Sequence, residues 1–287
     1  MNAFAPKRIL CPVDFSDQST TALRVAGAIA KTFGSELVVL HAQRLETPAY
    51  FTVAQTEALQ EQLRRSAKFA GEYVSEFTRK HLPGDVAHRV VVTEDDPVSA
   101  ILKTQQQISA DLIAMGTHGR GGLARIRLGS IAESVLHQAQ VPILTVGPGM
   151  KVAPAAEGMR RVLCPVNYQA SSRTALEHAA ALATGAGAEL TVAHIDEAPL
   201  GSTAQDSLRR LCDWIPSPVR AHCTVKEVVK QGNAAEQIVA EAEKSHADLL
   251  VIGAQPRYVL GSVPLGSTTE LVIRSAPCPV LSVREKQ

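Results

Sequence analysis

The sequence predicts an α/β protein made of two tandem domains, each with a five-stranded parallel sheet. Two observations predict this fold class. Short apolar runs alternate with stretches of helical periodicity along the whole chain, and such alternation is typical of parallel strands covered by helices on both faces. The chain also repeats itself in five separated blocks, which makes it a tandem duplication.

The repeat is dense. RILCPVDF (8–15) returns as RVLCPVNY (161–168), and His41 and His194 match at the same offset of 153 residues. Further on, ADLIAMG (110–116) returns as ADLLVIG (247–253), now at an offset of 137 residues. At this same offset Gly129-Ser130 corresponds to Gly266-Ser267, and VPILTV (141–146) corresponds to CPVLSV (278–283). The Gly- and Pro-rich segment 147–158 lies between the copies. We therefore expect domains at residues 1–148 and 159–287.

The first copy begins with a buried strand at 9–13, followed by a helix that Ser16 or Asp17 can cap and Gly34 ends. A strand at 37–42, a loop at 43–55 and a long helix over about 56–80 come next. The apolar run at 86–92 alternates enough to suggest an edge strand.

Asp95 or Asp96 then caps a helix with Pro97 at its first position, and strands at 112–115 and 143–146 complete the five. The second copy predicts strands near 161–166, 189–195, 221–229, 248–252 and 279–283, with a shortened second helix at about 203–214.

Composition excludes several function classes. Of the 287 residues 45% are hydrophobic, and the formal net charge is +1, which gives no electrostatic case for binding nucleic acid or a membrane surface. No apolar run is long enough to span a membrane, and we expect the N-terminal segment not to be a signal peptide because it quickly reaches charged residues. The 5 cysteines form no C-x-x-C pair and the 9 histidines form no ligand-spaced cluster, so we expect a cytoplasmic protein without a metal site.

A glycine-rich loop follows the fourth strand and leads into a helix. Gly116, Gly119 and the pair Gly129-Ser130 carry the spacing G-x2-G-x9-G-S, which suits a nucleotide-phosphate cradle because glycines allow close approach and helix N-termini bind anions. In open α/β sheets ligands bind beyond the carboxyl ends of the strands. Asp14 and Ala42 end the first two strands, so we expect them to share one crevice with this loop.

Other nucleotide motifs fit poorly. GRGGLA (119–124) satisfies G-x-G-x-x-A but follows the fourth strand and has no acid about twenty residues on. A P-loop fails because Gly122 stands where Lys is required, and neither S-G-G-x-D-S nor G-x-S-x-G is present. His118 lies in the cradle but has no activated nucleophile or orienting acid, so no catalytic residue is assigned. His41 and His194 repeat in both copies, which favours a structural hydrogen bond.

Three segments carry a family resemblance: the initial ILCPVDFS, the block GTHGRGGLARIRLGS and the downstream VPILTV. They resemble the universal stress protein family, and the resemblance covers nearly the whole chain, once in each copy. The resemblance implies a Rossmann-like domain of the adenine nucleotide α-hydrolase-like type, with strand order 3-2-1-4-5. Members with G-x2-G-x9-G-S/T bind ATP, so it also implies ATP, with or without Mg²⁺, as the cofactor. It further implies that the last strands, 142–146 and 279–283, pair the two domains; a homodimer of the whole chain is left open.

Carried over by position, the resemblance gives each site residue a role. Asp14 and Ala42 would hold the adenosine end, and Met115 and Gly116 would pack on the ribose. Pro12 and Val13 would line the adenosine end. The donors to the phosphates would be Gly119, Gly129, Ser130 and Ile131, and positive charge would come from Arg120, Arg125 and Arg127.

The second copy departs from this pattern. Asn167 replaces Asp14, and Pro256, which has no N–H to donate, replaces Gly119. We therefore predict one competent site, in the first domain, and one degenerate domain. The expected function is an ATP-binding regulatory protein of the stress response. A slow ATPase and a nucleotide-independent interaction scaffold are the alternatives.

Overall fold

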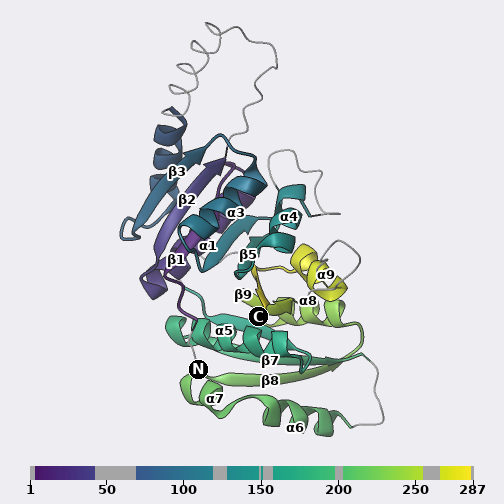
Figure 1. Cartoon of the computed structure of the whole chain (residues 1–287). Helices are drawn as coiled ribbons and strands as arrows, with labels where there is room; N and C mark the ends of the chain where they lie inside the picture. Colours follow the sequence, from purple (N-terminus) through teal and green to yellow (C-terminus); the bar gives the residue numbers. More distant parts are fainter. Residues whose placement is uncertain are drawn as a thin grey trace, which may run out of the picture.

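The computed structural model of the chain describes residues 4–42, 69–118, 128–148, 150, 158–197, 203–254 and 266–285. Its strands join into one ten-stranded sheet with the order β3-β2-β1-β4-β5-β10-β9-β6-β7-β8 (Figure 1). Each half therefore has the strand order 3-2-1-4-5, which confirms the predicted α/β class and its two five-stranded parallel sheets.

The first half follows the predicted elements closely. Its strands are β1 (Arg8–Pro12), β2 (Glu36–Ala42), β3 (His88–Thr93), β4 (Leu112–Gly116) and β5 (Ile143–Val146). Its helices are α1 (Asp17–Phe33), helical residues 69–81, α3 (Pro97–Gln107) and α4 (Ser130–Gln138). Strand β3 lies at the edge of the sheet, as its alternation suggests. The predicted loop at 43–55 and the first part of the long helix fall outside the described residues.

Local side chains start and stop these helices. Ser16 caps α1 by accepting a hydrogen bond from the Ser19 backbone N–H, and Asp96 caps α3 in the same way from Ser99, with Pro97 in the first turn. Gly34 ends α1 in the left-handed conformation, with φ 66°. The capping predictions are thus confirmed at both helix starts and at Gly34.

The second half contains β6 (Arg161–Val166), α5 (Ala170–Ala186), β7 (Glu189–Asp196), α6 (Ala204–Trp214), α7 (Ser217–His222), β8 (Val225–Gln231), α8 (Ala234–Lys244), β9 (Leu249–Ala254), α9 (Ser267–Ser275) and β10 (Val280–Arg284). The strand predicted near 221–229 is wrong at its start, because residues 217–222 form α7. Pro218, which is favoured in the first turn of a helix, lies at the start of that helix.

Helices cover both faces of the sheet, and the strands alternate their side chains between two buried clusters. The cluster on the α1 and α5 face includes Ile9, Cys11, Leu144 and Leu281. The opposite cluster includes Leu10 and the buried apolar side chains of α3, α4, α8 and α9. All five cysteines are free thiols, and burial raises the pKa of Cys11 and Cys164 well above the usual thiol range, as expected for small core residues.

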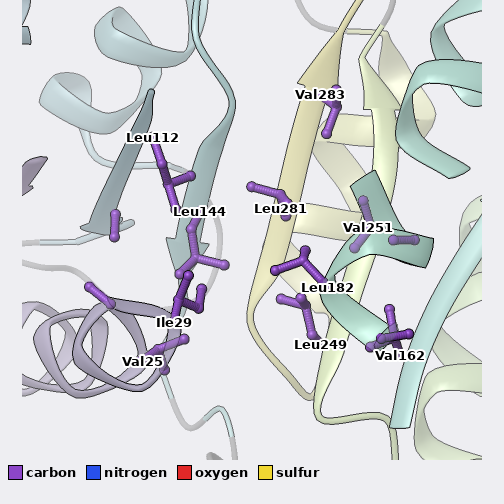
Figure 2. Packing of buried hydrophobic residues seen from close by; sticks show 14 of the residues in the cluster. Val25, Ile29, Leu112, Leu144, Val162, Leu182, Leu249, Val251, Leu281 and Val283 are labelled. Atoms are coloured by element: carbon purple, nitrogen blue, oxygen red, sulfur yellow. The ribbon is translucent and has the colours of Figure 1, made fainter. Parts of the chain in front are cut away.

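The two halves meet where β5 and β10 pair antiparallel. Leu144 lies opposite Leu281, and Thr145 Oγ1 donates to the Val280 carbonyl at 3.1 Å while Ser282 Oγ donates to the Ile143 carbonyl at the same distance. Figure 2 shows Leu144 and Leu281 on neighbouring strands, between the core residues of the first half and those of the second. The hydrophobic cluster on this face is therefore continuous across the junction.

No helix within the described ranges is long and apolar enough to cross a membrane.

Candidate functional site

A cavity of about 420 Å³ opens in the first half, at the carboxyl ends of β1, β2 and β4. This is the point where the strand order reverses, between β1 and β4, and open α/β sheets bind ligands at such a point. We call this cavity the first crevice. Its lining is Pro12, Val13, Asp14, Ser19, Leu40, Ala42, Pro97, Ile101, Met115, Gly116, Thr117, His118, Leu128, Gly129, Ser130, Ile131 and Ala132.

The structure brings together every predicted site residue that it describes. Pro12, Val13, Asp14, Ala42, Met115, Gly116, Gly129, Ser130 and Ile131 all line the first crevice. Gly119 and Arg120, together with Arg125 and Arg127, lie outside the described residues.

Sequence reasoning missed the contribution of α3. Pro97 and Ile101 lie in its first turns and form one wall of the first crevice. A signal was present, because α3 follows β3 and therefore begins at the same edge of the sheet as the other strand ends. Applying the strand-end rule to the third strand as well would have found this wall.

The turn after β1 fixes the carboxylate of Asp14. Its Oδ1 accepts hydrogen bonds from the Ser16 backbone N–H at 3.1 Å and from the Ser16 hydroxyl at 2.6 Å. Because Ser16 also caps α1, the carboxylate is oriented at the start of that helix, where the helix dipole favours negative charge. The first crevice thus contains a carboxylate held in one place by its own turn.

His41 supports this turn through a hydrogen bond to the backbone of Val13. Its Nδ1 lies 2.8 Å from the Val13 carbonyl oxygen, which can only accept, so Nδ1 carries the proton. Phe15 has the left-handed φ of 65°, uncommon for an aromatic residue, and its ring packs on His41 with centroids 4.7 Å apart. His194 and Tyr168 repeat both features, since His194 Nδ1 lies 2.8 Å from the Val166 carbonyl. The predicted structural hydrogen bond of the two histidines is confirmed.

Gly116 lacks a side chain for a reason that the sequence did not reveal. A Cβ placed there would lie 2.9 Å from the Cβ of Gln18 and 3.1 Å from its carbonyl carbon. The glycine therefore allows the start of α1 to pack on the end of β4, in addition to lining the first crevice. Gly253 does the same in the second half, where a Cβ would lie 2.7 Å from the carbonyl carbon of Ser171.

We accordingly expect Gly116→Ala to destabilise the protein by about 1–3 kcal/mol, because the backbone of α1 would have to shift. Urea denaturation of the full chain measures this, with Gly84→Ala as the control. Nothing lies within 4 Å of a Cβ at Gly84, so that change should cost less than about 0.5 kcal/mol. Equal effects of the two substitutions would show that α1 does not depend on Gly116.

The other end of the first crevice is the start of α4. The residue before this helix, Gly129, is its N-cap and makes no side-chain capping hydrogen bond, so the backbone N–H groups of the first turn have no partner within the helix. Gly129 itself donates its N–H to the Thr117 carbonyl at 2.8 Å, and a Cβ at this position would lie 2.8 Å from that same oxygen. Glycine is therefore required for α4 to begin this close to the end of β4.

His118 and Thr117 complete that end. The hydroxyl of Thr117 lies 3.0 Å from Nδ1 of His118 and 3.3 Å from the Val146 carbonyl oxygen. Thr117 is buried, and both residues line the first crevice. Among the described residues no group of three or more His, Cys, Asp or Glu side chains could hold a metal ion.

The equivalent cavity of the second half, which we call the second crevice, is much smaller, at about 180 Å³. Ile195 stands where the first half has Ala42, and Thr269 stands where it has Ala132. Glu197 adds a carboxylate to the lining, and that carboxylate accepts the N–H of Ala234 at the start of α8 at 3.2 Å. The larger side chains of Ile195 and Thr269 therefore reduce the space, and the carboxylate of this crevice comes from Glu197 and not from the turn after β6.

The turn after β6 keeps its shape without the charge. Asn167 Oδ1 accepts the Gln169 backbone N–H at 3.2 Å, as Asp14 accepts that of Ser16. Burial raises the pKa of the Tyr168 hydroxyl, and the ring packs on His194 and Trp214. Pro256 lies outside the described residues.

Comparison with known proteins places these features in a family. The sequence model of the universal stress protein family matches residues 6–147 and 218–284. A universal stress protein of Mycolicibacterium smegmatis is 25% identical, over 97% of this chain and 97% of its own length. One from Thermus aquaticus is 34% identical and matches 49% of this chain with 98% of its own.

A solved structure agrees with the architecture. The crystal structure of a universal stress protein from Archaeoglobus fulgidus superimposes with a TM-score of 0.76, at 24% identity, over 99% of this chain and 100% of its own. The likeness extends over both halves of the chain.

Proposed function

The chain belongs to the universal stress protein family, and from this premise we propose that its first crevice binds ATP, with or without Mg²⁺. The protein would then act as a nucleotide-dependent regulator in the stress response. The observation that supports this best is the convergence of the G-x2-G-x9-G-S loop ends, Asp14 and Ala42 on one cavity of about 420 Å³. Small-molecule pockets are typically about 300–1,000 Å³.

The lining of the first crevice combines apolar and polar side chains in a way that suits a nucleotide. Leu40, Ile101 and Met115 form an apolar part, next to Ala42, where an adenine ring would be removed from water. Asp14 also lines the first crevice, and its carboxylate can accept a hydrogen bond from a ribose or adenine donor.

The start of α4 provides the phosphate end. The backbone N–H groups of Ser130 and Ile131 lie in the uncapped first turn of a nine-residue helix, and the Ser130 hydroxyl adds a donor. Helix N-termini of this kind bind phosphate through N–H groups and the helix dipole. Gly119 would complete the cradle from the loop, as the family motif implies, and Arg120 would add positive charge there.

We propose one such site per chain, in a domain of residues 1–148, and a degenerate second domain of residues 159–287. The smaller second crevice, with Ile195 and Glu197 in its lining, supports this asymmetry. A cytoplasmic location is part of the proposal and is supported by the five free thiols.

Titration calorimetry of the full chain with ATP tests the proposal. We expect one site per chain, and at an ATP concentration of about 100 times the dissociation constant we expect roughly 2.7 kcal/mol of added stability. Two equivalent sites would contradict the asymmetry, and no binding heat together with no shift in melting temperature would contradict the function.

A matched pair of substitutions sharpens this test. Asp14→Asn removes the charge but can keep the turn, as Asn167 does in the second half, so it should weaken ATP binding by about tenfold. Asn167→Asp should leave both the affinity and the number of sites unchanged. Equal affinities in wild type and Asp14→Asn would remove Asp14 from the site.

A further inference from the structure

The second half holds one end of the helix that forms the phosphate end of the first crevice. Arg284, the last residue of β10, donates from Nη2 to the carbonyl oxygens of Leu136 at 2.6 Å and His137 at 2.9 Å. These are carbonyls of the last turn of α4, where intrahelical donors are missing and the helix dipole is negative. The contact joins residues almost 150 positions apart in the chain.

Helix α4 is therefore fixed at both ends by different parts of the protein. Its start is fixed by the first half, where Gly129 donates to the Thr117 carbonyl at the end of β4. Its end is fixed by the second half through Arg284. A nine-residue helix has little stability of its own, so its position depends on such contacts and on the buried side chains of Ala132, Val135 and Leu136.

The repeat does not provide a counterpart of Arg284 in the first half. At the 137-residue offset that relates the last strands, the first-half counterpart of Arg284 is Gly147, which has no side chain to donate to the end of α9. Helix α9 is the counterpart of α4, and its last-turn cation, Arg274, pairs with Glu270 of the same helix at 3.7 Å. The half with the small crevice thus contributes a contact to the end of α4, and the repeat does not place the same residue at the end of α9.

We propose that Arg284 is a positioning residue for the nucleotide site: it holds α4 so that the N–H groups of Ser130 and Ile131 meet the phosphates. The inference rests on the function proposed above. It assigns the second half a role in binding by the first half. The β5–β10 junction brings Arg284 to α4. A change in how the two halves are arranged at this junction would therefore alter the affinity of the first crevice for the nucleotide.

Calorimetry with ATP and with adenosine distinguishes a role of Arg284 in positioning α4 from a general disruption of the nucleotide site. Arg284→Met should weaken ATP binding by about tenfold and change adenosine binding by less than about twofold, because only the phosphates meet α4. Arg284→Lys keeps a cation and N–H donors at the helix end and should restore most of the ATP affinity. Arg274→Met, the matched change on α9, should leave both affinities unchanged.

Hydrogen exchange of the ligand-free full chain gives a readout that needs no nucleotide. Arg284→Met should speed exchange of the amides of α4 and leave those of α9 unchanged. If wild-type protein does not bind ATP, the proposed function fails, while the exchange rates still decide whether Arg284 holds α4. Three results would each overturn the inference. They are unchanged exchange of the α4 amides in Arg284→Met, equal losses of ATP and adenosine binding, and equal effects of Arg284→Met and Arg274→Met.

Discussion

Replacing Ala42 by Ile is expected to weaken ATP binding by about 100-fold or more while leaving the fold intact. Ala42 ends β2 and lines the apolar part of the first crevice, and the second half has Ile195 at the same position. Three added carbon atoms would occupy the volume that we assign to the adenine ring. Because one methylene in a binding pocket is worth roughly 1–3 kcal/mol, ATP affinity should fall by about 100-fold or more.

The second half shows why the fold should tolerate this change. Ile195 is buried at the end of β7 with the same strand pairing, so a β-branched side chain fits this backbone. The melting temperature of ligand-free Ala42→Ile should therefore stay within about 3 °C of the wild type, a shift that corresponds to about 1 kcal/mol. Only the stabilisation by added ATP should decrease.

The reciprocal substitution, Ile195→Ala, is the control. It enlarges the second crevice, but Asn167 and Glu197 remain in its lining, so the chain should still bind one ATP with unchanged affinity. If Ala42→Ile bound ATP as tightly as the wild type, the ligand would have to lie elsewhere. If Ile195→Ala gained a second site, side-chain size alone would explain the asymmetry of the two halves.

Much of the fold could be predicted because its signals are local. Ser16, Gly34 and Pro97 act within one turn of the helices they start or end, so the sequence around each of them predicts the boundary. The repeat then confirms each element by a second copy. The error at 221–229 has a local cause as well, since the run after residue 218 is rich in β-branched residues while Pro218 favours the start of a helix.

The sequence predicts those site residues that lie at the carboxyl ends of strands, but not those that other contacts bring to the site. Asp14 follows β1, while Ala42 and Gly116 end β2 and β4, and the parallel sheet brings such positions to one edge. The sequence indicates that Gly116 must be small but not that α1 lies against it. Arg284 could not be predicted at all, because it reaches α4 across the junction of the two halves and no local pattern marks that contact.

Truncating Leu281 to Ala is expected to produce the largest loss of stability among these predictions. Leu281 is fully buried on β10, opposite Leu144 of β5, in the hydrophobic cluster that is continuous across both halves (Figure 2). Removing a fully buried Leu side chain leaves a cavity and typically costs about 2.7–5 kcal/mol. Three residue pairs make up the β5–β10 ladder, so little else at this pairing can compensate.

Urea denaturation of the full chain measures the effect, with Leu271→Ala as the matched control. Leu271 lies on α9 in the same half and is 45% exposed, so its truncation should cost less than about 1 kcal/mol. We also expect Leu281→Ala to separate the unfolding of the two halves into distinct transitions, because the junction would no longer couple them. A loss no larger than that of Leu271→Ala, with a single transition retained, would mean that the halves are held together without this contact.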